Sequence, residues 1–273
     1  MITIDSSKCV RCGDCRSICH ASAISNGSES IEIDYKLCST CCQCIACCPT
    51  GALSWNGIKS RKIIRELLPE DESLTELLKA RHSIRSFKDK PVETEKLEKI
   101  CAAAKLAPTN NYDIELIVVR DVEKMAKLEE INLSYIKRMD GLIYKNPLVF
   151  NILKLFKTAA NDTDREKIKR VLERGNIFQK APVLIILTAD PKIHYTEQSC
   201  QYAMYNMMLT AQTMGLGSCI SGAGKMILAR SKKAEELLEM PKGKKIQGIL
   251  FMGYPAVSFT KTVEGNLPKV KWI

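Results

Sequence analysis

The sequence has no long uninterrupted run of apolar residues. Its most apolar long stretch, GLIYKNPLVFNILKLF at residues 141–156, is broken by lysines, asparagines and a proline. A membrane-spanning helix needs about 18 or more consecutive apolar residues, so we expect no membrane span and interpret this stretch as an amphipathic lid or interface helix. The polar start MITIDSSK lacks the apolar core of a secretory signal peptide. A reducing, cytoplasmic location is therefore expected.

Histidine is scarce, and none of the three, His20, His82 and His194, lies at metal-binding spacing from a cysteine or carboxylate. No Ser-His-Asp arrangement and no paired carboxylates stand out, so we predict no catalytic side chain, which fits chemistry carried by a cofactor. Aromatic residues make up only 6% of the chain and do not alternate with its basic residues. Nucleic-acid binding is therefore not expected, despite the net charge of +10.

That positive charge lies almost wholly beyond residue 56, because the first 56 residues have about as many acids as bases. A basic second domain can hold a phosphate or meet an acidic partner. We expect one bound phosphate together with ordinary surface charge.

Cysteine, by contrast, is abundant: ten of the thirteen lie within the first 48 residues. They form two runs with the same spacing, C-x2-C-x2-C-x3-C, and the second run ends in Cys48-Pro49. A [4Fe-4S] cluster takes four thiolates, and in two-cluster chains the fourth cysteine of each run binds the other cluster. The predicted sets are Cys9, Cys12, Cys15 and Cys48 for one cluster, and Cys38, Cys41, Cys44 and Cys19 for the other.

The two runs also form an internal repeat, since residues 9–25 align without gaps on residues 38–54. Two half-domains related by a pseudo-twofold axis are expected. Residues 1–56 resemble the bacterial 2[4Fe-4S] ferredoxins, with MITID and IEID as strands on either side of the first loop. The chain departs from that family at His20, where a proline usually follows the fourth cysteine.

Two other uses of dense cysteines remain open, structural zinc and a disulfide framework. The triple run suits a cluster better than zinc, and the missing signal peptide disfavours disulfides. Cys42 and Cys47 exceed the eight ligands and are interpreted as small residues near a cluster. A shifted register with Cys47 in place of Cys48 is the alternative, although Cys48-Pro49 and the match to Cys19 favour Cys48.

Residues 57–72 are predicted to be a linker, followed by a helix at residues 73–80 with Ser73 as its cap. The helix leads into the segment RHSIR. In an extended segment alternate side chains share one face, so Arg81, Ser83 and Arg85 can converge on one anion. A phosphate suits two planar, permanently charged guanidinium groups.

Residues 73–273 resemble the nitroreductase family of flavoproteins. After RHSIR, the motifs LAPTNN, APVLIILTAD, GLGSCISG and GYP follow in family order, with a long helix before GLGSCISG. The resemblance implies an α+β fold with a helix-flanked mixed sheet, placed after the small ferredoxin-like domain. It also implies a homodimer with two FMN sites at its interface.

The resemblance also implies which residues contact FMN. Its phosphate and ribityl groups are expected at Arg81, Ser83 and Arg85, with His82 inside the motif but pointing away, and with Lys261 as a further basic contact. Pro108, Thr109 and Asn110 match a segment that reaches FMN from the neighbouring subunit. Cys219, Ile220, Ser221 and Gly222 match a loop whose backbone approaches the flavin ring. The segment after Thr109 is shorter than in the family, and a redox role for the Cys219 thiol stays an open hypothesis.

Other conspicuous residues are interpreted as structural. Cys101, Cys200 and the methionines of the helix at residues 197–215 are expected in the core, the methionines alternatively at a dimer interface. The helical excursion at about residues 121–180 is expected to be a lid that shapes a substrate pocket.

Together these features predict an FMN-dependent oxidoreductase supplied with electrons by two [4Fe-4S] clusters. The external donor is expected to be reduced ferredoxin or a nicotinamide, and the substrate a nitroaromatic, a quinone or an activated alkene. One alternative is an electron-relay or redox-sensing flavoprotein without its own substrate. Another is a flavin reductase or a reductive dehalogenase-type member of the family.

Overall fold

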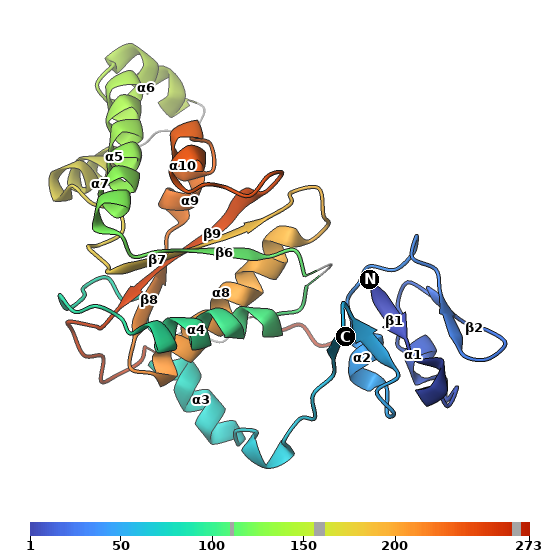
Figure 1. Cartoon of the computed structure of the whole chain (residues 1–273). Coiled ribbons are helices and arrows are strands. Elements are labelled where there is room, and N and C mark those ends of the chain that lie inside the picture. The colour runs from blue at the N-terminus through green and yellow to red at the C-terminus, as the bar shows by residue number, and fades with distance from the viewer. Residues whose placement is uncertain (110–111, 156–161, 264–268) are drawn as a thin grey trace.

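The computed structural model describes residues 1–109, 112–155, 162–263 and 269–273. The chain forms two modules that lie side by side in Figure 1. We call residues 1–59 the N-terminal module and residues 71–273 the C-terminal module. The stretch between them contains the 3-10 turn Arg65–Leu67. No helix in these described ranges is long and apolar enough to cross a membrane.

The N-terminal module consists of two small antiparallel sheets and two short helices. One sheet has the order β1-β4-β5, formed by Ile2–Ile4, Leu53–Trp55 and Ile58–Lys59, and the other pairs β2, Ile24–Asn26, with β3, Ile31–Ile33. A 3-10 turn at Ser6–Lys8 and the helices α1, Asp14–Ser17, and α2, Gln43–Cys47, complete it. The strands expected at MITID and IEID are β1 and β3. The sheet continues to Lys59, beyond the expected boundary at residue 56.

The two cysteine runs fold alike. Helix α1 follows Gly13 and helix α2 follows Cys42, 29 positions further along the chain, and both residues have left-handed backbone, with φ of +87° and +59°. This conformation costs glycine little and other residues more. Cys42 therefore occupies the second repeat's equivalent of a glycine position.

The strand pairs obey the same repeat. The backbone N–H of Asp5 donates to the carbonyl of Ala52, and that of Asp34 donates to the carbonyl of Ala23, both at 2.8 Å. Asp34 follows Asp5 by 29 positions, and Ala52 follows Ala23 by 29. Each half of the repeat therefore makes the same hydrogen bond to the other half. The contacts agree with the pseudo-twofold expected from the sequence.

The C-terminal module contains a four-stranded sheet in the order β6-β7-β9-β8. Its strands are Glu115–Val119, Val183–Ala189, Lys245–Gly253 and Gly217–Ile220 for β6, β7, β9 and β8. All three pairings are antiparallel, so the expectation of a mixed sheet was wrong. The excursion between β6 and β7 leaves and re-enters the sheet at the same end, which makes these neighbours antiparallel. In the described part of the chain, parallel pairing occurs at the isolated bridge between Ser83 and Ser218.

Helices cover both faces of this sheet. One face packs on α4, Thr94–Ala103, and α8, Thr196–Thr213, and the other on α5, Val122–Met139, α9, Gly222–Leu228, and α10, Lys232–Leu237. Side chains of a strand alternate between faces, so Ile185 of β7 joins the first cluster and Ile186 the second. Burying each such side chain contributes about 1.5–3 kcal/mol. This two-sided burial explains why β7 is apolar except at Thr188 and why β9 is apolar from Ile249 to Met252.

The remaining helices connect these layers. Between β6 and β7 the chain forms α5, a π-helical turn at Asp140–Tyr144, α6, Pro147–Leu155, and α7, Asp162–Arg174. Figure 1 shows these helices projecting beyond the sheet, and the predicted helical excursion is confirmed. A 3-10 turn at Ala104–Leu106 follows α4.

Helix α3 spans Asp71–Ala80 and starts earlier than predicted. Ser73 lies inside it and is not its cap; Glu70, directly after Pro69, is the N-cap residue. Acidic residues in the first turn, Asp71 and Glu72, suit the positive end of the helix dipole, which allows the helix to begin two residues before Ser73.

The core interpretation of α8 is confirmed. Cys200, Met204 and Met207 are fully buried and Met208 is 4% exposed. All four belong to the apolar cluster between α8 and the sheet, and Cys101 of α4 packs against it half-buried.

Candidate functional site

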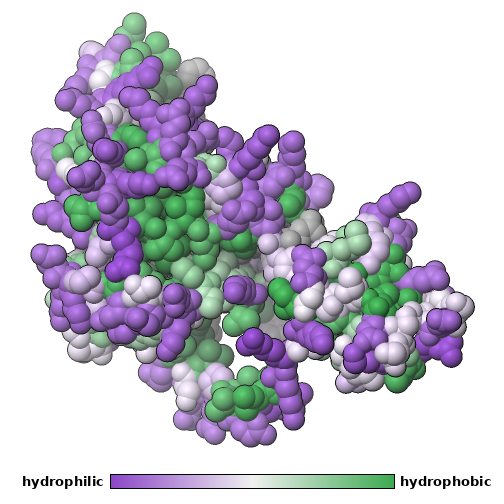
Figure 2. Space-filling model, viewed as in Figure 1, coloured by the Kyte–Doolittle hydropathy of each residue, from purple (hydrophilic) through white to green (hydrophobic). Residues whose placement is uncertain are grey.

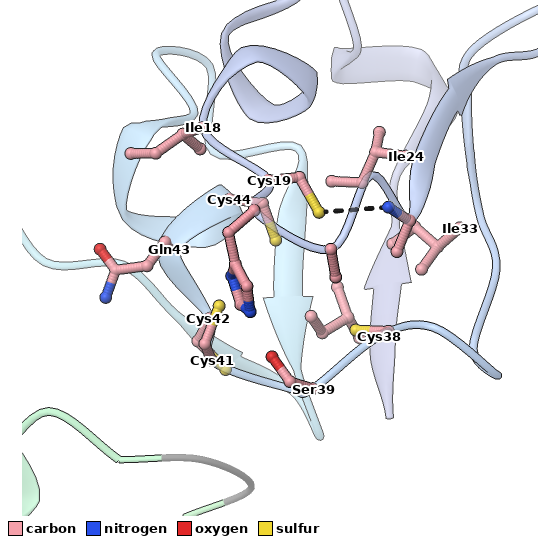
Figure 3. A pocket seen from close by; sticks show the side chains of 14 residues that line it. Ile18, Cys19, Ile24, Ile33, Cys38, Ser39, Cys41, Cys42, Gln43 and Cys44 are labelled. Carbon is pink, nitrogen blue, oxygen red and sulfur yellow. Dashed lines mark hydrogen bonds between the residues drawn. The ribbon is translucent and has the colours of Figure 1, made fainter.

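The predicted cluster ligands line two cavities of the N-terminal module. One has Cys9, Cys12, Cys15 and Cys48 in its wall. The other has Cys19, Cys38, Cys41 and Cys44 in its wall, together with His20 and Cys42. Figure 3 shows the cysteine side chains arranged around this second cavity. Each cavity therefore joins three cysteines of one run to the last cysteine of the other.

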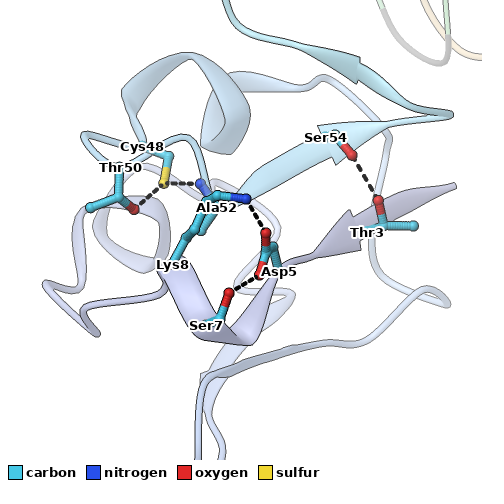
Figure 4. Close-up of polar contacts among 8 residues, drawn as sticks. All are labelled: Thr3, Asp5, Ser7, Lys8, Cys48, Thr50, Ala52 and Ser54. Atoms are coloured by element: carbon cyan, nitrogen blue, oxygen red, sulfur yellow. Dashed lines mark hydrogen bonds and ion pairs between the residues drawn. The ribbon is translucent and has the colours of Figure 1, made fainter.

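Backbone donors point at the two cysteines that cross between the runs. The N–H of Ala23 donates to Cys19 Sγ at 3.4 Å, and the N–H of Ala52 donates to Cys48 Sγ at 3.3 Å. Figure 4 shows the Cys48 contacts, which include Thr50 Oγ1 at 3.6 Å. Donors of this kind stabilise a ligating thiolate and fix its orientation.

The thiol pKa values differ according to these contacts. Burial would raise the pKa of Cys48, but hydrogen bonds from Thr50 and Ala52 lower it below its usual value. Burial raises the pKa of Cys44 to about 12, with a further increase from Cys41. Metal binding requires the thiolate, so loading these sites would release protons.

Cys42 and Cys47, the two cysteines beyond the eight predicted ligands, make different contacts. Cys42 Sγ contacts the carbonyl of Thr40 at 3.4 Å and lines the second cavity, whereas Cys47 Sγ contacts the carbonyl of Cys44 at 3.5 Å. All thirteen cysteines are free thiols. Within the described ranges, no three His, Cys, Asp or Glu side chains are grouped to hold a single metal ion.

A second cluster of predicted residues lies along the β8 edge of the large sheet. Ser83 forms a bridge with Ser218, and the N–H of Ile84 donates to the Ser218 carbonyl at 3.0 Å. Ile84 is 5% exposed and packs so closely on Gly217 that a Cβ there would lie 2.3 Å from its side chain. This packing fixes the RHSIR segment to the beginning of β8.

The chain after RHSIR is held on its other side by the segment that follows β9. The N–H of Lys88 donates to the Tyr254 carbonyl at 2.8 Å, and the N–H of Ala256 donates to the Ser86 carbonyl at 2.9 Å. The Tyr254 hydroxyl donates to Glu93 Oε2 at 2.6 Å. The GYP motif therefore positions the RHSIR segment.

Within this segment, Arg81 is the residue most plainly prepared for a ligand. Its Nε is buried and has no hydrogen-bond partner among the residues that the structure describes, a costly state for a charged donor unless an anion binds there. Arg85 is exposed. His82 stacks on Phe259 at 4.5 Å and contacts the Ala80 carbonyl through Nδ1 at 3.0 Å, so its ring is already occupied. Lys261, two residues after Phe259, is exposed.

The residues matched to the flavin-ring loop continue from the same strand. Cys219 is buried in the core, with its Sγ near the Ile220 carbonyl at 3.6 Å. Ser221 caps α9 by accepting the N–H of Gly224, and Gly222 begins that helix. The structure thus brings the RHSIR segment and the segment Cys219–Gly222 to one edge of the sheet. The latter was expected to be a loop, but it is the end of β8 and the start of α9.

The third predicted group lies elsewhere. Pro108 and Thr109 precede β6, which is the opposite edge of the sheet. Asn110 lies outside the described residues. A single chain therefore does not bring the Pro108–Thr109 group to the Arg81 motif.

One contact near Thr109 was not anticipated from the sequence. The ring of Trp55, in the N-terminal module, lies 5.1 Å from the ring of Tyr112, in the C-terminal module. Burial raises the pKa of the Tyr112 phenol, and the nearby Cys42 and Cys41 raise it further. Both aromatic residues line an open groove between the modules, with Cys42 and Cys48 on one wall and Thr109 on the other. Figure 2 shows this groove as the hollow between the two modules.

Ionic contacts hold the Tyr112 segment in place. Asp113 Oδ2 accepts the N–H of Asp190, and Asp113 Oδ1 pairs with Lys244 Nζ at 3.0 Å. Lys244 also pairs with Glu115 at 2.8 Å. Tyr112 itself has left-handed backbone, with φ of +49°, a conformation that persists only where neighbouring contacts fix it.

Comparison with known proteins agrees with this geometry for the C-terminal module. The model of the Nitroreductase family matches residues 78–254. A curated protein of Archaeoglobus fulgidus, provisionally named an NADH dehydrogenase/NAD(P)H nitroreductase, is 26% identical over 191 residues, which are 67% of this chain and 86% of that protein.

Solved structures share the fold. A nitroreductase with bound FMN from Desulfitobacterium hafniense superposes with a TM-score of 0.57 at 22% identity, covering 74% of this chain and 100% of that one. A second nitroreductase with bound FMN, from Bacteroides fragilis, gives 0.53 at 24% identity, with the same coverage.

Proposed function

Because the chain belongs to the nitroreductase family through residues 78–254, we propose that it is an FMN-dependent oxidoreductase with a built-in iron-sulfur supply. Two [4Fe-4S] clusters in the N-terminal module deliver single electrons, and FMN on the C-terminal module collects two and reduces a small electrophile. The observation that carries the proposal is the pair of four-cysteine cavities next to a module of a flavoprotein family.

The donor set of each cavity fits a [4Fe-4S] cluster. Four thiols surround each space, and backbone N–H groups already donate to Cys19 and Cys48. In the proposal, one cluster takes Cys9, Cys12, Cys15 and Cys48, and the other takes Cys19, Cys38, Cys41 and Cys44. When bound, the clusters supply one-electron transfer at a potential set by the surrounding hydrogen bonds and burial.

The β8 edge fits an anionic cofactor. The unpaired, buried Nε of Arg81 is a ready donor to a phosphate, and Ser83 and Arg85 follow in the same extended segment. The segment Cys219–Gly222, which runs from the end of β8 into the start of α9, lies further along this edge and is assigned to the ring. When bound, FMN supplies the conversion between one- and two-electron chemistry, while these side chains bind and orient it.

The proposal assigns the remaining expectations as follows. The helices α5, α6 and α7 act as the lid that selects a nitroaromatic, quinone or activated alkene. The chain acts as a homodimer, with Pro108, Thr109 and Asn110 reaching the partner's FMN and Lys261 supporting the phosphate. The external donor is reduced ferredoxin, and NADH or NADPH is the competing donor.

Anaerobic purification followed by iron, sulfide and flavin analysis tests the cofactor assignment. Two clusters and one FMN per chain are expected, with electron paramagnetic resonance signals of reduced [4Fe-4S] centres. Zinc in place of iron, or a chain that binds no flavin after reconstitution, would refute it. Turnover of nitroaromatics, quinones and activated alkenes then separates an enzyme from an electron relay, which would reduce none of them.

A further inference from the structure

The N-terminal module touches the C-terminal module at the edge of the sheet away from the proposed flavin site. The contact residue Tyr112 precedes β6, whereas Ser83 pairs with β8, and the strand order is β6-β7-β9-β8. In Figure 1 the N-terminal module lies beyond the β6 side of the sheet.

The strand register gives the distance between the start of β6 and the end of β8. Glu115 of β6 is in register with Ile246 of β9 through Thr188, while Ile220 of β8 is in register with Leu250. Three strand spacings across the sheet and four residues along it separate these points by roughly 20 Å. Electron transfer slows steeply as such a gap widens.

The contact between the modules is specific and well supported. Trp55 packs on Tyr112, and Asp113 is held by Asp190 and Lys244. Cys42, which lines the second cavity, also lines the groove that contains Tyr112. Cys48, from the other ligand set, lines the same groove.

The β6 edge of the sheet is exposed. Strand β6, of sequence ELIVV, is an edge strand, and Val118 is 39% exposed. Next to it the intermodule groove has Leu106, 80% exposed, and Ile63, 71% exposed, in its wall. Figure 2 shows an apolar area over β6. An open apolar edge of this kind suits another chain.

We propose that the N-terminal module reduces the flavin held by a second copy of the chain, not the flavin of its own chain. The second copy brings its β8 edge to the groove, and the cluster held by Cys19, Cys38, Cys41 and Cys44 faces it through the Trp55–Tyr112 contact. Two one-electron transfers from reduced clusters, with two protons from water, convert the oxidised flavin to its reduced form and return the clusters to their oxidised state. The inference rests on the proposed function.

Hybrid dimers of full-length chains with two different affinity tags test it. In the first hybrid, one chain carries Cys12→Ser and Cys41→Ser and lacks clusters, while the other carries Arg81→Ala and Ser83→Ala and lacks FMN. In the second hybrid, one chain is wild type and the other carries all four substitutions. The readout is the rate of flavin bleaching after anaerobic mixing with reduced ferredoxin, and iron and flavin contents verify each hybrid.

The two hybrids have opposite predictions. The first should bleach its flavin at the wild-type rate per flavin, and the second only at the rate of the cluster-free homodimer. The reverse result would overturn the inference while leaving the proposed function intact. A wild-type protein that sediments as a monomer and still bleaches rapidly would overturn the inference and the proposed homodimer, but not the proposed supply of electrons from the clusters to FMN. If wild type is no faster than the cluster-free homodimer, the proposed function itself fails.

A matched pair of substitutions tests the contact. Tyr112→Leu should slow bleaching while leaving iron and flavin contents unchanged, and it should speed tryptic cleavage in the basic segment between the modules. Tyr195→Leu removes another tyrosine with left-handed backbone, φ +62° and 71% exposed, and should change neither rate. Unchanged bleaching and cleavage in Tyr112→Leu would reject the contact.

Discussion

Among single residues, Cys47 and Cys48 offer the sharpest contrast. The two thiols are adjacent in sequence, yet Cys48 lines a cavity and accepts an N–H from Ala52, whereas Cys47 contacts the carbonyl of Cys44. Cys48→Ser should lose one cluster, and Cys47→Ser should keep both. Iron analysis and the visible spectrum of the anaerobic proteins measure this, and loss of a cluster only in the Cys47 variant would reverse the ligand assignment.

Among the predicted FMN contacts, Arg81 is the side chain whose surroundings best suit an anionic ligand. Its buried Nε has no partner in the described part of the chain, so Arg81→Ala should release FMN by removing a charge-assisted contact worth about 1.5–3 kcal/mol. That corresponds to roughly a 10- to 150-fold weaker Kd, measurable by flavin fluorescence on titration. Arg230→Ala is the control, since Arg230 is exposed and its side chain donates to the Met226 carbonyl. Equal FMN affinity in the two variants would contradict the assignment.

Among elements, the attachment of RHSIR to β8 depends on one glycine. A methyl group on Gly217 would lie 2.3 Å from Ile84 Cγ1, and overpacking of this kind costs about 1–3 kcal/mol. Gly217→Ala should therefore lower Tm and FMN affinity together, because displacing Ile84 moves the flanking Ser83 and Arg85. Thermal unfolding and flavin titration provide the two readouts.

The matched control for that variant is Gly141→Ala. A Cβ at Gly141 has no neighbour within 4 Å, so both Tm and FMN affinity should stay close to wild type. If Gly217→Ala behaves like this control, Ile84 does not position the phosphate motif.

The elements also mark the limits of sequence reasoning. The extent of β9 and the core position of Met204 and Met207 follow from local apolar patterns, and the repeated backbone of the cysteine runs follows from spacing. The antiparallel sheet does not, because strand direction depends on where a long excursion returns. The cap prediction at Ser73 failed because Pro69 ends the preceding segment and leaves room for an earlier helix start.

At the scale of the whole molecule, the strand order places the predicted site residues at two opposite edges of the sheet. Arg81 and Ile220 are far apart in sequence but share the β8 edge, while Thr109, though nearer to Arg81 in sequence, lies at the β6 edge. The Trp55–Tyr112 contact joins two modules whose motifs are read separately. Only the three-dimensional arrangement relates these residues to one another.

The central claim is that the clusters supply the flavin, and anaerobic stopped-flow mixing tests it most directly. The wild type and the Cys12→Ser, Cys41→Ser double variant are each mixed with reduced ferredoxin, NADH and NADPH while the iron-sulfur and flavin bands are followed. With reduced ferredoxin, the wild type should bleach its iron-sulfur bands first and its flavin band second, and the double variant should lose the rapid flavin phase. The claim is contradicted if NADH or NADPH reduces the flavin of the double variant as fast as reduced ferredoxin reduces that of the wild type.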